Sequence, residues 1–256
     1  MSPDESNSSR ASTPPRAVNA DPLPTLFAHR GGARGRRENT IRAFEDALRD
    51  GATGLETDIR LTADGVPVLS HDRSFRRFRV LKKPIATLPH SLVPPRIPTL
   101  DAFYAALGTE LPLSVDLKDH EAFHPVLETA LHAGGESAIQ ALLICGQSVE
   151  QLGAWRDAEP RVRLVRSADK PPKRIEDARA EFRDLAAVGA VAVNYRARNW
   201  TQELIGAAHD VGLKAFAWDA NRGSVLTRVV RAGVDAVYAD DVPWMVSAAT
   251  MALRST

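Results

Sequence analysis

Cysteine is nearly absent from this sequence. Its 256 residues include one, Cys145, and a single cysteine excludes a disulfide within the chain. Because Cys145 lies in the apolar stretch ALLICG, we expect it to be a small buried hydrophobic residue rather than a reactive thiol. A chain with one buried cysteine fits a reducing compartment best.

Long apolar runs are also missing. Charged residues interrupt each apolar stretch before it reaches the roughly 18 residues of a membrane span, so we predict no stable membrane insertion. Residues 1–22 are polar, rich in Ser and Pro, and lack the apolar core of a secretion signal. We therefore expect a disordered tail over residues 1–22 and a cytoplasmic protein.

Neither sign of charge dominates. Lys and Arg total 33 and Asp and Glu total 32, which gives a formal net charge of +1. The basic residues are spread along the chain instead of forming a stripe, so a nucleic-acid partner is not expected. The sequence leaves the oligomeric state open.

Short apolar runs alternate with helical patterns from residue 25 onward, and many of the helical patterns end in glycine. Repeated strand-helix units predict an α/β fold, a (β/α)8 TIM barrel forming a single domain over residues 23–256, with a doubly wound open sheet as the alternative. The expected strands are residues 25–29, 54–59, 111–117, 141–145, 162–166, 190–195, 214–218 and 236–240. The clearest helical patterns are residues 40–51, 99–108, 122–135, 175–189, 201–212 and 224–233.

Residues 73–99 break this even spacing. They are rich in proline and basic residues, which predicts a loop over the barrel mouth rather than a barrel element. Such a loop is either a solvated connector or a determinant of specificity.

Two acidic residues and a histidine mark the most informative stretch, LETDIRLTADGVPVLSHD, residues 55–72. Side chains along a strand alternate between faces, so Glu56 and Asp58 share a face, about 7 Å apart along the chain. The ADG sequence predicts a turn, and the apolar run after it predicts a hairpin return. We therefore expect His71 to come back toward the two acids.

Other strands also end in polar residues. In a barrel the functional groups lie at the carboxyl ends of the strands. The first expected strand ends in His29 and Arg30, the third supplies Asp116 and Lys118, and the seventh ends in Trp218. We expect these side chains to meet at one rim of the barrel.

Three carboxylates would then converge, from Glu56, Asp58 and Asp116. Such a cluster is costly unless a cation neutralises it, and ligands that are all oxygen favour Mg²⁺ or Ca²⁺ over zinc. The sequence therefore predicts a site for one divalent cation.

Cationic residues and histidines flank this predicted metal site. Arg30 and Lys118 would face an anion such as a phosphate, and His29 and His71 suit general acid and base roles. Each residue alone has a structural explanation: a histidine can be a hydrogen-bonded structural residue, and the acids can lie on a solvent-exposed face. Their convergence from several strand ends favours phosphoester cleavage.

Five blocks of sequence resemble the glycerophosphodiester phosphodiesterase family. In order they are AHRGG, ENTIRAFEDALRDGATGLETDIRLTADGVPVLSHD, SVDLK, AWDAN and GVDAVYADD, and the resemblance runs from about residue 25 to residue 245. It implies a (β/α)8 barrel with one divalent metal ion, Mg²⁺ or Ca²⁺. It also implies hydrolysis of small glycerophosphodiesters to an alcohol and glycerol 3-phosphate, as part of phospholipid catabolism.

The resemblance also implies residue roles. His29 and His71 match the family's acid-base pair, and Glu56, Asp58 and Asp116 match its metal ligands. The remaining site residues, Arg30, Lys118 and Trp218, correspond to phosphate or substrate contacts.

One departure concerns the third metal ligand, because Asp116 stands where the family usually has a longer Glu. Three alternatives stay open. One is a lysophospholipase D activity on substrates that keep an acyl chain. A second is a phospholipase C-like barrel with the same paired-histidine logic, and the third is a degenerate barrel that only binds a phosphate ligand. The sequence leaves the released head group open.

Overall fold

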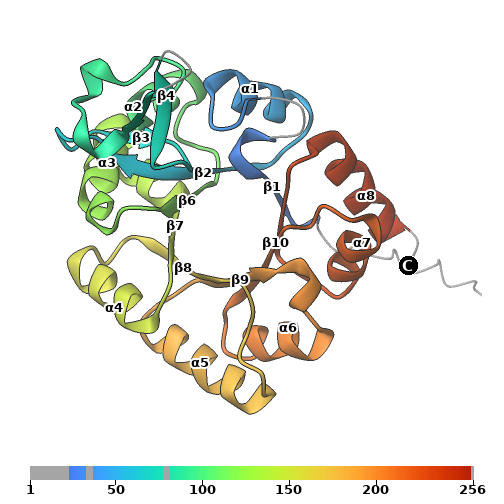
Figure 1. Cartoon of the computed structure of the whole chain (residues 1–256). Coiled ribbons are helices and arrows are strands. Elements are labelled where there is room, and N and C mark those ends of the chain that lie inside the picture. The colour runs from blue at the N-terminus through green and yellow to red at the C-terminus, as the bar shows by residue number, and fades with distance from the viewer. Residues whose placement is uncertain (1–22, 33–36, 78–80, 255–256) are drawn as a thin grey trace, which may run out of the picture.

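The computed structural model describes residues 23–32, 37–77 and 81–254 of the chain. Within these residues, eight parallel strands close into a barrel surrounded by helices (Figure 1). The ring runs β1-β11-β10-β9-β8-β7-β6-β2, and β1 pairs with both β11 and β2, which closes it. The predicted (β/α)8 fold is confirmed, whereas the tail predicted for residues 1–22 lies outside the described residues.

Each expected strand is present. The barrel strands are β1 (Thr25–Ala28), β2 (Gly54–Leu61), β6 (Leu113–Leu117), β7 (Leu142–Gly146), β8 (Arg163–Ala168), β9 (Ala192–Arg196), β10 (Lys214–Trp218) and β11 (Ala236–Ala239). The helices are α1 (Ile41–Arg49), α2 (Leu100–Leu107), α3 (Phe123–Ala141), α4 (Val149–Ala158), α5 (Ile175–Ala187), α6 (Gln202–His209), α7 (Gly223–Arg231) and α8 (Val242–Arg254). None of the helices in the described ranges is long and apolar enough to cross a membrane.

Hydroxyl side chains fix where several helices begin. Thr40, Thr99, Ser148 and Thr201 each accept a hydrogen bond from the backbone N–H three residues on, at the starts of α1, α2, α4 and α6. The helix α3 is longer than the predicted segment 122–135, and a non-helical residue, Gly135, interrupts it before it runs on to β7.

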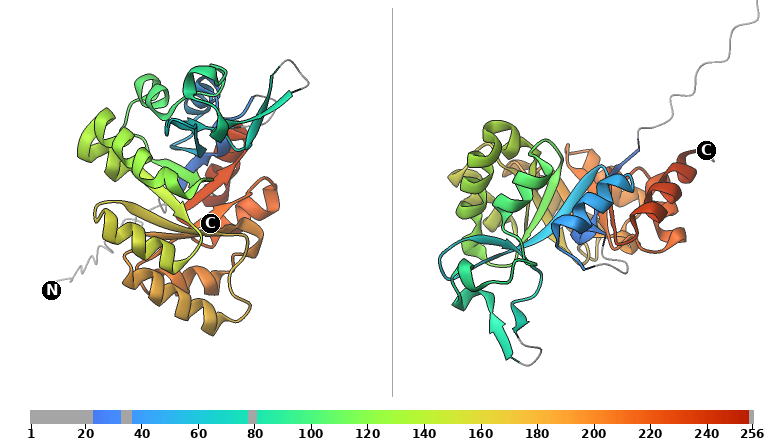
Figure 2. Two further views of the ribbon diagram at one scale, coloured as in Figure 1. Left: turned by 60° about the vertical axis from the view of Figure 1, so that its left-hand side comes forward. Right: turned by 90° about the horizontal axis from the view of Figure 1, so that it is seen from above.

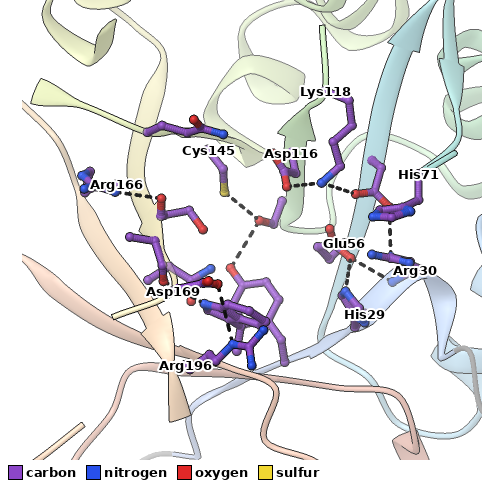
Figure 3. Close-up of a pocket in the computed structure, with 18 residues that line it drawn as sticks. His29, Arg30, Glu56, His71, Asp116, Lys118, Cys145, Arg166, Asp169 and Arg196 are labelled. Atoms are coloured by element: carbon purple, nitrogen blue, oxygen red, sulfur yellow. Dashed lines mark hydrogen bonds and ion pairs between the residues drawn. The ribbon is translucent and has the colours of Figure 1, made fainter. Parts of the chain in front are cut away.

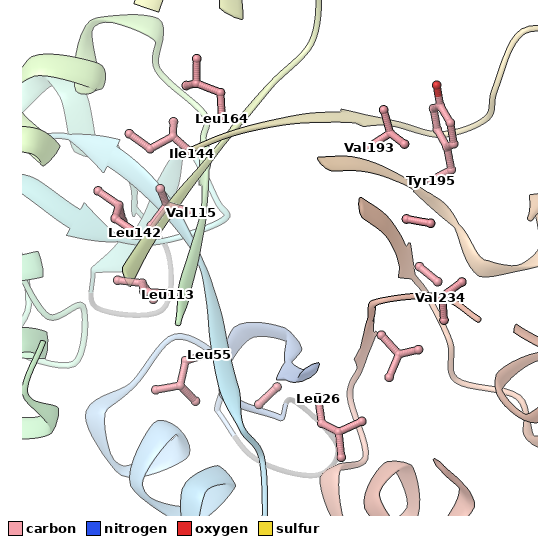
Figure 4. Packing of buried hydrophobic residues seen from close by; sticks show 14 of the residues in the cluster. Leu26, Leu55, Leu113, Val115, Leu142, Ile144, Leu164, Val193, Tyr195 and Val234 are labelled. Atoms are coloured by element: carbon pink, nitrogen blue, oxygen red, sulfur yellow. The ribbon is translucent and has the colours of Figure 1, made fainter. Parts of the chain in front are cut away.

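Two apolar layers hold the barrel together. The larger layer lies between the strands and the surrounding helices, where side chains such as Leu55, Val115 and Ile144 are buried (Figure 4). Each such side chain contributes about 1.5–3 kcal/mol relative to an exposed position. The smaller layer fills the barrel interior and includes Phe27, Phe216 and Tyr238. Cys145 belongs to this inner layer and is buried, as expected.

A glycine makes the inner layer possible. A Cβ atom at Gly54 would lie 2.6 Å from Cε1 of Phe27, so only glycine leaves room for this ring. The Phe27 ring stacks on Tyr238, with centroids 4.5 Å apart and planes 11° apart. These rings form the floor on which the polar mouth of the barrel rests.

The stretch following β2 departs from the barrel pattern in two ways. The hairpin return is confirmed: β3 (Pro67–Leu69) pairs antiparallel with β2. Residues 73–99 stay outside the barrel, as predicted, but they are more regular than a loop. Apart from residues 78–80, which are not described, they contain an antiparallel pair, β4 (Ser74–Arg77) with β5 (Leu81–Pro84), and two 3₁₀ turns.

This insert, residues 73–99, projects from one end of the barrel (Figure 2). It has a small core of its own, in which Phe75, Ile85 and Val93 pack on Val68 of β3. The expectation of an irregular loop was wrong because prolines and basic residues masked these spaced apolar positions.

Candidate active site

A cavity of about 660 Å³ opens at the carboxyl ends of the barrel strands. All eight residues singled out in the sequence line it: His29, Arg30, Glu56, Asp58, His71, Asp116, Lys118 and Trp218. Figure 3 shows His29, Arg30, Glu56, His71, Asp116 and Lys118 on one side, with Arg166, Asp169 and Arg196 on the other. The expected convergence of strand ends is therefore observed, and we call the two sides the charged half and the far wall.

A tight turn after β1 places the first two residues of the charged half. Arg30 has a φ of 53° and Gly31 a φ of 81°. A Cβ at Gly31 would lie 3.0 Å from Ala43 Cβ, so glycine lets the turn pack against α1. In this conformation the Arg30 backbone N–H donates to Glu56 Oε2 at 2.9 Å. The turn thereby ties the end of β1 to the acid on β2.

His29 is held from both sides. Its Nδ1 lies 2.7 Å from Asp240 Oδ1, and its Nε2 lies 3.9 Å from Glu56 Oε2. Burial lowers the pKa of His29, but the charge of Glu56 and the hydrogen bond to Asp240 outweigh it and raise the pKa to about 9. Asp240 in turn accepts from Asn221 Nδ2 at 2.9 Å. Asp240 is thus a positioning residue, a role that its sequence position did not indicate.

The two acids on β2 lie in different surroundings. Burial, followed by the nearby charges of Asp58 and Asp116, raises the pKa of Glu56 to about 7. Burial also raises the pKa of Asp58, but the cations of Lys118 and Arg30 outweigh it and hold that pKa below its ordinary value. Lys118 Nζ lies 2.9 Å from Asp58 Oδ1 and Arg30 Nε lies 3.0 Å from Asp58 Oδ2.

Asn39 is a second positioning residue for this half. Its amide donates to Asp58 Oδ2 at 3.2 Å and accepts from the Thr57 hydroxyl at 2.7 Å, in a buried position. Its φ of 54° is a conformation that asparagine tolerates better than most residues. The ENT block of the sequence therefore has two tasks, because Asn39 orients Asp58 and Thr40 caps α1.

Asp116 extends the charged half onto the neighbouring strand. It is the register partner of Asp58 across the β2–β6 pair, and Lys118 Nζ lies 2.5 Å from its Oδ2. Its side chain is 39% exposed, against 2% for Asp58. Burial lowers the pKa of Lys118, but Asp116 and Asp58 outweigh it and raise the pKa.

The donor chemistry of these three acids fits a hard divalent cation, since all their ligand atoms are carboxylate oxygens. Burial is the main cause of the raised pKa of Glu56, and the charges of Asp58 and Asp116 add to it, so a cation beside Glu56 would favour its ionised form. The acids do not form a closed cage, because no group of three or more His, Cys, Asp or Glu side chains in the described ranges is arranged to hold a metal ion. The Lys118 ammonium instead joins Asp58 and Asp116.

His71 reaches the cavity from the hairpin return, as expected. The backbone N–H of Ser70 donates to the Asp58 carbonyl at 2.9 Å, and Arg60 Nη2 donates to the His71 carbonyl at 3.0 Å. The His71 side chain is 42% exposed, and its Nδ1 lies 3.3 Å from Asp72 Oδ1. The backbone here is therefore fixed while the ring stays accessible from the mouth.

The far wall comes from β8, β9 and β10, and only Trp218 was predicted from it. Asn194 and Arg196 alternate on β9 as Glu56 and Asp58 do on β2, and both line the cavity. The same two-residue spacing at the end of the predicted strand 190–195 was the signal that could have found them. The Arg196 guanidinium lies 4.4 Å from the centroid of the Trp218 ring.

Fold and cavity together define a (β/α)8-barrel protein with a charged pocket at the carboxyl ends of its strands. A family model described as the glycerophosphoryl diester phosphodiesterase family matches residues 29–243. The chain belongs to this family.

Relatives agree with this assignment. A glycerophosphodiester phosphodiesterase of Caldanaerobacter subterraneus subsp. tengcongensis is 25% identical over 236 residues, which cover 84% of this chain and 93% of that protein. Mouse glycerophosphodiester phosphodiesterase 1 is 39% identical over 113 residues, covering 38% of this chain and 34% of the mouse protein. Glycerophosphodiester phosphodiesterase domain-containing protein 4 of Macaca fascicularis is 52% identical over 59 residues, covering 23% of this chain and 9% of that protein.

Solved structures show the same fold. A phosphodiesterase from Oleispira antarctica, in complex with the product sn-glycerol-3-phosphate, superposes with a TM-score of 0.75 at 20% identity, over 88% of this chain and 96% of that one. A glycerophosphodiester phosphodiesterase from Thermotoga maritima gives a TM-score of 0.73 at 22% identity, over 87% of this chain and 97% of that one.

Proposed function

We propose that this protein hydrolyses glycerophosphodiesters to an alcohol and glycerol 3-phosphate. The observation that carries the proposal is the convergence of His29, His71 and three carboxylates on one cavity, from separate strands of a barrel that belongs to this family. The Caldanaerobacter relative, which aligns over most of both chains, bears the name of this activity.

The two histidines move protons in this proposal. One accepts the proton of the substrate's own glyceryl hydroxyl as its oxygen attacks phosphorus, and the other donates a proton to the departing alcohol as its P–O bond breaks. Water then attacks the resulting cyclic phosphate, one of its ring P–O bonds opens, and the two proton transfers reverse. Both histidines thus return to their starting states, with glycerol 3-phosphate as the product.

The cationic residues hold the phosphate. Arg30 and Lys118 both contact Asp58 while lining the cavity, so their charges are fixed where a phosphodiester would lie. Trp218 lines the far wall of the same cavity and would contact another part of the substrate.

Glu56, Asp58 and Asp116 would hold one divalent cation, Mg²⁺ or Ca²⁺. When bound, such an ion polarises phosphoryl and hydroxyl oxygens and offsets negative charge. Lys118 already contacts one oxygen of Asp58 and one of Asp116, so a metal ion would share these two carboxylates with the ammonium group. Asp116 is the most exposed of the three acids and would be the weakest of the proposed ligands.

The cavity favours a deacylated diester over a lysophospholipid. Most of the side chains that line it are polar or charged. Among the described residues the exposed large hydrophobic side chains are Leu23, Leu92 and Met251, and none of them lines the cavity. We further propose a cytoplasmic role in phospholipid catabolism, with residues 23–256 as the catalytic domain.

The test is release of glycerol 3-phosphate from glycerophosphocholine, glycerophosphoethanolamine and glycerophosphoinositol, with lysophosphatidylcholine as a fourth substrate. Each is assayed with Mg²⁺, Ca²⁺ or EDTA. We expect metal-dependent turnover of the deacylated diesters, which His29→Ala lowers by about 10²–10⁴-fold. Lysophosphatidic acid formed from the lysolipid alone would establish a lysophospholipase D. No turnover of any substrate would leave a phosphate-binding barrel.

A further inference from the structure

The far wall of the cavity contains hydrogen-bonding atoms that the protein leaves unused. Asn194 is 5% exposed and lines the cavity, and its Oδ1 has no hydrogen-bond partner. Two residues further along β9, the buried Nε of Arg196 also lacks a hydrogen bond, since its nearest acid, Asp169, is 3.6 Å away. Unpaired buried polar atoms are costly, so an acceptor without a partner, next to a donor that has only a long ion pair, indicates a ligand at this wall.

Each arginine of this wall already forms ion pairs within the protein. Arg166 Nε lies 3.1 Å from Glu181 Oε1, and Arg196 lies between Asp169 at 3.6 Å and Asp219 at 3.8 Å. A second anionic group on the substrate would therefore meet arginines that already have acids beside them.

The aromatic surface of the wall already carries a cation. The Arg196 guanidinium lies 4.4 Å from the centroid of Trp218, and it covers one face of the indole. A quaternary ammonium group such as choline binds best on a free aromatic face. Here it would compete with a fixed guanidinium of the same charge.

We infer that the far wall selects, by hydrogen bonds from Asn194 and Arg196, a glycerophosphodiester whose departing alcohol is a neutral polyol. A hydroxyl group can both donate and accept, so adjacent hydroxyls satisfy Asn194 Oδ1 and Arg196 Nε together. This specificity rests on the proposed function. It adds the class of the alcohol, such as an inositol or a second glycerol, to the reaction.

The experiment compares kcat/KM for glycerophosphoinositol and glycerophosphoglycerol with kcat/KM for glycerophosphocholine. We expect the polyol diesters to lead by about tenfold or more, because each buried group left unpaired costs about 1–3 kcal/mol. Turnover of glycerophosphocholine at an equal or higher kcat/KM overturns this inference and leaves the proposed function standing. No turnover of any diester overturns both.

Two variants test the residues. Asn194→Leu removes the acceptor and should lower the ratio of kcat/KM on the polyol diesters to kcat/KM on glycerophosphocholine by about tenfold. An equal loss on every diester would place Asn194 against the shared glyceryl group and overturn the inference.

Arg196→Met removes the donor and frees the Trp218 face, so the ratio of polyol to choline turnover should fall even if the Asn194 variant does not fold. The matched control is Arg198→Met, an exposed residue outside the cavity lining, which should leave the ratio unchanged. An unchanged ratio in Arg196→Met contradicts the inference.

Discussion

The two sides of the cavity are built in opposite ways. In the charged half, Lys118 contacts two acids, Arg30 contacts Glu38 and Asp58, and His29 lies between Glu56 and Asp240. On the far wall, Arg196 has only long ion pairs, at 3.6 Å and 3.8 Å, and Oδ1 of Asn194 has no hydrogen bond. Each substitution in the charged half should disturb several groups, whereas the longer ion pairs of Arg196 should couple the far-wall residues less strongly.

The largest effect on turnover should come from His71→Ala. If His71 transfers a proton, its loss should lower kcat by about 10²–10⁴-fold with little change in stability, because the ring is partly exposed. The control is His132→Ala, at an exposed position on α3. Steady-state kinetics and thermal unfolding of both variants check this, and near-normal kcat in His71→Ala would remove His71 from the chemistry.

A second contrast lies within the charged half. Asp58→Asn should lower the free energy of unfolding by about 2 kcal/mol in EDTA, because a buried acceptor for two cations is lost. Asp116→Asn, at a more exposed acid beside the same Lys118, should cost less than about 1 kcal/mol. Urea unfolding of both variants measures the difference, and equal costs would mean that burial does not set the strength of these pairs.

The smallest effect should come from Asp169→Asn on the far wall. Asp169 is 76% exposed and lies 3.6 Å from Arg196, so we expect a change below about 0.5 kcal/mol in stability. The kcat/KM on glycerophosphocholine should stay within about twofold of the wild-type value. If Asp169→Asn lowered turnover as much as His71→Ala does, the contrast between the charged half and the far wall would be wrong.

The alternation of apolar runs and helical patterns made the fold predictable from the sequence, and paired acids made the charged half predictable, whereas most of the far wall was missed. Glu56 and Asp58 stood out because two like charges on one strand face need a partner. Asn194 and Arg196 have the same spacing on β9, but a neutral amide and a single arginine do not repel each other and so do not indicate a missing partner. Their significance depends on a missing hydrogen bond, which only a three-dimensional structure can show.

Asp240 was not predicted as a site residue and the insert was predicted as an irregular loop, for related reasons. Asp240 belongs to β11's end, and its role appears only when the closed ring brings it to 2.7 Å from His29, 211 positions away in sequence. The insert forms a small core because Phe75, Ile85 and Val93 meet Val68 in space. Local patterns predict periodic elements well, but they carry little information on such distant contacts.

The aromatic side chains inside the barrel determine how substrates enter and how products leave. Phe27 packs in the space that Gly54 leaves open and stacks on Tyr238. These rings block passage through the interior of the barrel. Whatever reaches the strand ends arrives and departs on the mouth side. A diester that has been cut leaves two fragments in the same vestibule, and the slower of them to diffuse away determines when the next molecule can dock.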